Sequence, residues 1–119
     1  VNIIRKENMG YFYLIIAIIG EVVGTLSLKS SNGFTAITPS ILVIVGYGVA
    51  FYFMILSMKT IPVAITYSIW SGVGIAAVTF IASMKFNEKP DIFALIGLSF
   101  IIIGIIILVS LSKMGAKIS

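Results

Sequence analysis

Long hydrophobic runs separated by short polar segments dominate the pattern of this 119-residue chain. Each run is close to the roughly 20 apolar residues that cross a bilayer as a helix. A spanning β-barrel is excluded, because a chain of this length cannot close a barrel of ordinary size. We therefore predict an all-α membrane protein with four transmembrane helices, at about residues 9–28, 39–58, 63–84 and 92–112.

Polar segments join the predicted helices. Residues 29–38 are rich in Ser, Asn and Gly, as turns are, and Pro39 suits the first turn of the helix that follows. Met9 is a plausible start, so we interpret residues 1–8 as a polar N-terminal extension. The other polar segments are two connections and a C-terminal tail, at residues 59–62, 85–91 and 113–119.

Composition excludes several classes of function. The chain is 60% hydrophobic and 10% charged, with a mean hydropathy of +1.19, which is unlike a soluble domain. Cysteine and histidine are absent, which removes disulfides, thiol chemistry, the usual zinc sites and histidine acid–base catalysis. We expect neither an enzyme nor a cofactor or metal site. The net charge of +4 is spread over ends and loops, so no nucleic-acid partner is expected.

The basic residues give only a weak indication of orientation. An even number of spans puts both chain ends on one side of the membrane. That side carries Arg5, Lys6, Lys59, Lys113 and Lys117, and the other side carries Lys29, Lys85 and Lys89. The positive-inside rule then favours internal termini weakly. A bias this small is compatible with insertion in both orientations.

Glu21 is the one charged residue inside the predicted spans. A carboxylate at that depth costs several kcal/mol unless it is paired, protonated or facing water, so it usually has a function. The alternative is a buried, neutral Glu21 that hydrogen-bonds Thr25 or Ser27. Its helical stripe includes small and polar residues and suits either a cavity or close helix packing. The stripe contains Leu14, Ala17, Ile18, Gly24, Thr25 and Leu28.

Aromatic residues lie deep in the second and third predicted helices. Tyr47 and Phe51 are four positions apart, and Tyr67, Trp70 and Ser71 follow a second helical stripe. Aromatic faces attract cations, so these rings and Glu21 suit a lipophilic cation, while a proton suits the carboxylate equally. The alternative is an aromatic packing stripe. Four glycines suggest a bend in the third helix and a helix contact in the fourth: Gly72, Gly74, Gly97 and Gly104.

From Met9 to about Ser112 the chain resembles the small multidrug resistance family of proton-coupled exporters. The resemblance rests on EVVGTLSLKSSNGFT (21–35), Pro39, GYGVAFYF (46–53) and IPVAITYSIWSGVGI (61–75), with Phe86, Glu88, Asp91 and the Gly97/Gly104 pair. It implies an antiparallel homodimer with alternating access, in the plasma membrane of a bacterium or archaeon. Gly24 stands where the guanidinium-exporting branch has a Trp, which points to the multidrug branch. Ala36 departs from the basic residue of many members.

The resemblance also implies roles for individual residues. Glu21 of both subunits would bind protons or cations competitively at one shared site. The substrate-binding residues would be Glu21, Tyr47, Tyr67 and Trp70, with Phe51, Leu14, Ala17, Ile18, Gly24, Thr25 and Ser71 around them. The third helix would bend at Gly72 and Gly74, and the dimer would contact at Gly97 and Gly104.

Two other functions remain open. The first is a guanidinium exporter of the same family. The second is a non-transporting accessory subunit of a larger membrane complex, in which Glu21 is a buried assembly contact.

Overall fold

A computed structural model of the chain describes the backbone of residues 2–112 and the side chains of residues 8–112. Within that range there are four helices and no strand, which confirms the predicted all-α membrane class. The helices are α1 (Asn2–Ser30), α2 (Ile37–Met58), α3 (Val63–Lys85) and α4 (Ile92–Ser110). All four are long and apolar enough to cross a membrane. The predicted tail at 113–119 lies outside the described residues.

The first helix begins earlier than its hydrophobic pattern indicates. α1 starts at Asn2, and the helix runs through the segment that we expected to form a polar extension. Arg5, Lys6 and Glu7 are good helix formers, and no proline interrupts the segment. The apolar span itself starts at Asn8. The hydropathy pattern therefore predicts the part of α1 that suits a bilayer. Helix propensity explains why α1 extends beyond that part toward the N-terminus.

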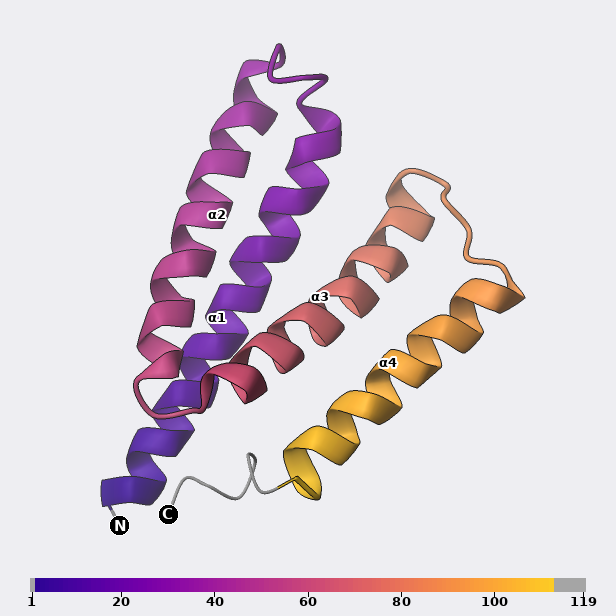
Figure 1. The fold of residues 1–119 in the computed structure, drawn as a ribbon. Helices are drawn as coiled ribbons and strands as arrows, with labels where there is room; N and C mark the ends of the chain where they lie inside the picture. The colour runs from indigo at the N-terminus through magenta and orange to yellow at the C-terminus, as the bar shows by residue number, and fades with distance from the viewer. Residues whose placement is uncertain (1, 113–119) are drawn as a thin grey trace.

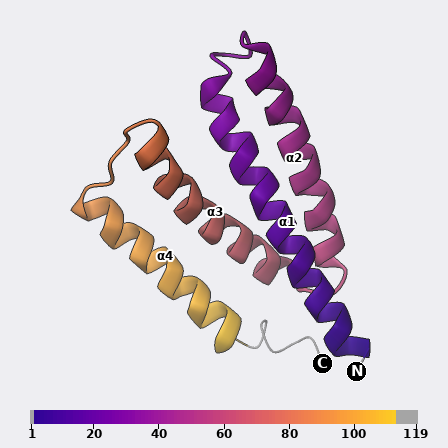
Figure 2. The ribbon, with the colours of Figure 1, turned by 180° about the vertical axis from the view of Figure 1, so that it is seen from behind.

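The helices form two antiparallel hairpins, α1–α2 and α3–α4 (Figure 1). α1 packs along α2 over most of its length and touches α3 less extensively, while α4 contacts only α3 among the described helices. The hairpins meet near the α2–α3 turn and diverge toward their other ends, as the view from behind also shows (Figure 2). The backbones of α1 and α3 therefore move apart from the α2–α3 turn toward the ends of the two helices.

Glycines bring α1 and α2 into backbone contact. A Cβ atom on Gly46 would lie 2.7 Å from the carbonyl oxygen of Gly20 and 2.8 Å from the amide nitrogen of Gly24. A Cβ atom on Gly20 would lie 2.8 Å from the Gly46 carbonyl oxygen. Only residues without a side chain fit so close a crossing. Gly24 thus has a packing role, which was one of its two interpretations.

The small core lies where α1 meets α3. Leu14, Ile18 and Val22 are buried on α1, and Trp70 and Val78 of α3 pack against them. On α4, by contrast, none of the described residues is buried. In a bilayer such an apolar helix faces lipid or another protein chain on every side except the one toward α3.

Candidate functional site

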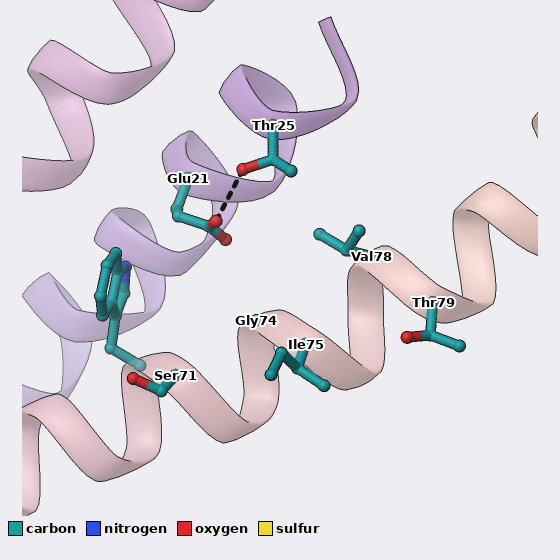
Figure 3. Close-up of a pocket in the computed structure, with 8 residues that line it drawn as sticks. Glu21, Thr25, Ser71, Gly74, Ile75, Val78 and Thr79 are labelled. Carbon is teal, nitrogen blue, oxygen red and sulfur yellow. Dashed lines mark hydrogen bonds between the residues drawn. The ribbon is translucent and has the colours of Figure 1, made fainter. Parts of the chain in front are cut away.

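Glu21 lies on the face of α1 that is turned toward α3, where it lines a cavity between the two helices (Figure 3). Its Oε1 atom accepts a hydrogen bond of 2.7 Å from the hydroxyl of Thr25, one helical turn further on. Its Oε2 atom is buried and has no hydrogen-bond partner among the described residues. The interpretation of Glu21 as an acid satisfied by Thr25 therefore holds for one carboxyl oxygen and leaves the other unpaired.

Tyr47 of α2 extends this hydrogen-bonded chain. Its hydroxyl lies 2.7 Å from the hydroxyl of Thr25. A threonine hydroxyl has one proton, so when Thr25 donates to Glu21 it accepts from Tyr47. The contact is possible because Gly24 lets the Tyr47 ring approach: a Cβ atom at position 24 would lie 2.9 Å from that ring. Tyr47 thus orients Thr25 toward the carboxyl group.

A cavity of about 310 Å³ lies against the unpaired side of Glu21. Figure 3 shows Glu21 and Thr25 of α1 facing Gly74 and its neighbours on α3. Gly74 lets α3 come close, because a Cβ atom there would lie 3.0 Å from Glu21 Oε2. The lining residues are Glu21, Thr25, Trp70, Ser71, Gly74, Ile75, Val78 and Thr79. An acid, three hydroxyl groups and an indole ring thus share one space in the middle of the spans.

Four aromatic rings form a row from α2 to α3 beside the cavity. Ring centroids are separated by 6.3 Å for Tyr47 and Phe51, 6.4 Å for Phe51 and Trp70, and 5.5 Å for Tyr67 and Trp70. Trp70 Nε1 is buried without a partner among the described residues. Phe51 and Tyr67 keep 52% and 55% of their surface exposed, so a single chain leaves this row half uncovered.

Several residues with a predicted role lie away from the cavity lining. Leu14, Ala17 and Ile18 are buried on α1. Gly72 packs against Ile105 of α4. Gly97 and Gly104 face open space on α4, with no atom within 4 Å of a Cβ atom built there. The binding, hinge and dimer roles of these residues stay predictions.

Three lining residues were not singled out from the sequence. Ile75, Val78 and Thr79 continue the α3 face that begins at Ser71. The signal was present, because Ser71, Ile75 and Thr79 are spaced by four and so share a helical face. Only the packing of α3 against α1 shows that this face is turned toward Glu21.

Comparison with known proteins gives consistent matches over most of the chain. The family model described as Small Multidrug Resistance protein matches residues 9–103. Quaternary ammonium compound-resistance protein QacE of Escherichia coli is 47% identical over 107 residues, which are 90% of this chain and 97% of QacE. Multidrug transporter PA4990 of Pseudomonas aeruginosa is 43% identical over an alignment that covers 87% of this chain and 94% of PA4990. Quaternary ammonium compound-resistance protein QacC of Staphylococcus aureus is 39% identical over an alignment that covers 82% of this chain and 92% of QacC.

Proposed function

This chain belongs to the Small Multidrug Resistance protein family, and we propose that it exports quaternary ammonium and other lipophilic cations in exchange for protons. Its four apolar helices make it a multi-pass integral protein, and its bacterial relatives indicate the plasma membrane. The names of QacE and QacC refer to resistance to quaternary ammonium compounds, which supports this substrate class.

The unpaired Oε2 atom of Glu21 carries the proposal. A buried acceptor without a partner is unfavourable by about 1–3 kcal/mol, and a buried bare charge by more. A proton on the carboxyl group removes the charge, and a cation in the adjoining cavity neutralises it. Both solutions use the same carboxyl group, so proton and cation compete for Glu21. A site that opens alternately to the two sides of the membrane then exchanges one for the other.

The shape of the cavity suits an organic cation better than a metal ion. Its volume is about 310 Å³. Sites for small molecules have volumes of roughly 300–1,000 Å³, so this cavity is near the lower end of that range. Trp70 offers an aromatic face, which attracts cations of low hydration. Among the described residues no three of the potential metal ligands His, Cys, Asp and Glu lie together.

The two alternatives find less support. A guanidinium exporter of this family would place a Trp at position 24, where even a Cβ atom lies 2.9 Å from the Tyr47 ring. A competition assay of a quaternary ammonium dye against guanidinium separates the two substrate classes. An accessory subunit would transport nothing when reconstituted alone, whereas an exporter would move both dye and protons.

Proton release on ligand binding tests the exchange mechanism. We expect tetraphenylphosphonium to expel protons from the purified, weakly buffered protein, because the cation and the proton compete for Glu21. Simultaneous calorimetry and pH recording measure the binding of the cation and the release of protons. Binding without any proton release at low pH would mean that the two ions do not share the acid.

Trp70 is expected to contribute to cation binding through its aromatic face. Trp70→Ala should weaken tetraphenylphosphonium binding by about three- to thirtyfold, since a cation–π contact contributes roughly 0.5–2 kcal/mol. Trp70→Phe is the matched control, because it keeps an aromatic face and should retain most of the affinity. Equal affinities of the two variants in a calorimetric titration would assign Trp70 to packing alone.

We propose further that two copies assemble as an antiparallel dimer in which both Glu21 residues share one site. The half-uncovered aromatic row and the exposed α4 are surfaces that a second copy would cover. Gly97 and Gly104 lie seven residues apart, two turns, on one face of α4. A Cβ atom built on either would have no atom of another described helix within 4 Å. Small residues at such spacing let helices from two chains approach closely.

The dimer proposal predicts the effect of a branched side chain on α4. Gly104→Val should convert the protein to monomer in mild detergent, because the added methyl groups hold the two helices apart. Chemical cross-linking measures the oligomeric state. Ser99→Val is a control on the same helix for the general effect of an added β-branched residue. A Gly104→Val variant that cross-links as the unmodified protein does would remove this face of α4 from the interface.

A further inference from the structure

A second arrangement of carboxylate and aromatic ring lies between the end of α1 and the α3–α4 connection. The ammonium group of Lys29, in the last turn of α1, forms an ion pair with the Glu88 carboxylate. The same ammonium lies 4.8 Å from the centroid of the Phe86 ring. A carboxylate beside an aromatic face is a favourable environment for an ammonium ion. The chain's own lysine therefore occupies a cation site.

The backbone holds the two groups of this site in place. The amide groups of Phe86 and Glu88 both donate to the carbonyl oxygen of Ala82, at 2.9 and 3.3 Å. Asn87 between them has a φ of 58°, a left-handed conformation that asparagine tolerates better than most residues. This turn ends α3 and directs Glu88 back toward α1. The site is thus part of the end of α3 and not of a free loop.

The site also lies in line with the Glu21 cavity. Lys29 follows Glu21 by eight residues on α1, or roughly 12 Å along the helix, and Thr25 lies halfway between them. Phe86 is the C-cap of α3, one residue beyond its last helical residue Lys85 and seven residues after the lining residue Thr79. Phe86 and Glu88 therefore lie beyond the cavity lining, between the end of α1 and the end of α3.

We propose that Phe86 and Glu88 form a peripheral binding site for organic cations between the ends of α1 and α3, beyond the lining of the Glu21 cavity, with Lys29 as an internal competitor. The ligand class rests on the proposed function. Lys29 and Glu88 keep 55% and 50% of their side-chain surface exposed, so their ion pair is weak and easily exchanged. A lysine ammonium is strongly hydrated, whereas a lipophilic cation loses little water when it reaches an aromatic ring. An organic cation can therefore replace Lys29 at this site.

Lys85 provides a matched control. Its ammonium lies 5.5 Å from the centroid of the same ring, and no ion pair joins it to Glu88 among the described residues. Lys29→Met and Lys85→Met each remove one positive charge from the surroundings of Phe86 and keep an apolar side chain. Only Lys29→Met removes the ammonium group that is paired with the Glu88 carboxylate.

The test measures tetraphenylphosphonium binding by calorimetry in a Glu21→Gln background, which takes away the central acid. Adding Lys29→Met should produce saturable binding about three- to tenfold tighter than adding Lys85→Met, as expected for a surface cation–π contact together with an exposed charge pair. The gain should disappear when Glu88→Gln or Phe86→Leu is added. Helical content by circular dichroism and gel-filtration profile confirm that each variant is folded.

Two outcomes would overturn the peripheral site. Equal affinities of the Lys29→Met and Lys85→Met variants would show that only the general charge matters. A gain that survives Glu88→Gln and Phe86→Leu would place the ligand elsewhere. Failure of the proposed function gives a different result, because Glu21→Gln alone would then bind tetraphenylphosphonium as tightly as the unmodified protein. The comparison of affinities between the Lys29→Met and Lys85→Met variants does not depend on how tightly Glu21→Gln alone binds tetraphenylphosphonium.

Discussion

Glu21→Gln is expected to abolish proton-driven transport of tetraphenylphosphonium while leaving the protein folded. The amide has the shape of the carboxyl group, and its oxygen can still accept the hydrogen bond that Thr25 donates at 2.7 Å. The amide cannot take up or release a proton, so no exchange can be coupled. Uphill uptake by proteoliposomes with an imposed pH gradient measures the effect, and it should fall to the level of protein-free liposomes.

Asp91→Asn is the control variant, because it also replaces an acidic residue by its amide but at a position outside the cavity lining. Asp91 is exposed and caps α4, where its Oδ1 atom accepts a hydrogen bond of 2.8 Å from the amide of Ala94. Asparagine caps helices about as well as aspartate, so this variant should transport normally. Uphill uptake by the Glu21→Gln protein would contradict the proposed mechanism directly.

The second large effect is expected at the crossing of α1 and α2. Gly46→Val should destabilise the protein severely, because the new Cβ atom would meet backbone atoms of Gly20 and Gly24 at 2.7–2.8 Å. Rotation of a side chain cannot relieve a clash between backbones, so the helices must separate. Overpacking of this kind costs about 1–3 kcal/mol or more. The separation would also pull Tyr47 from Thr25 and weaken cation binding.

Gly48→Val isolates this packing effect. Gly48 lies two residues further along α2, is exposed, and has no atom within 4 Å of a Cβ atom built on it. Both variants lose one glycine from the same helix, so they share the change in helix propensity. Thermal unfolding in detergent, followed by circular dichroism, should show a lower midpoint for Gly46→Val only. Equal midpoints would mean that the close crossing does not contribute to stability.

Hydropathy was sufficient to predict the four helices and their order, because a bilayer requires long apolar helices and little else. The same signal missed the start of α1 at Asn2. Arg5, Lys6 and Glu7 are too polar to count as part of a span, yet they favour helix. Each signal reports one property, and the end of a helix need not coincide with the end of its apolar part.

The candidate site was predictable only within single helices. Helical spacing grouped Glu21 with Thr25 and Trp70 with Ser71, and these four residues do line one cavity. Contacts between helices could not be derived, because spacing does not show which faces meet or how closely. The bend at Gly74 stays a prediction, and its closeness to the Glu21 carboxyl group depends on how α3 packs against α1. The close contact of Gly46 depends in the same way on Gly20 and Gly24 of another helix.

The exposure of α4 has a consequence for biogenesis. α4 is made after α1, α2 and α3, and among the described helices it touches only α3. The first three helices can therefore reach their places as the chain leaves the ribosome, whereas α4 enters the bilayer with one neighbour. Within residues 2–112 only α3 packs against α4, so lipid or another protein must take up the rest of its surface as it inserts.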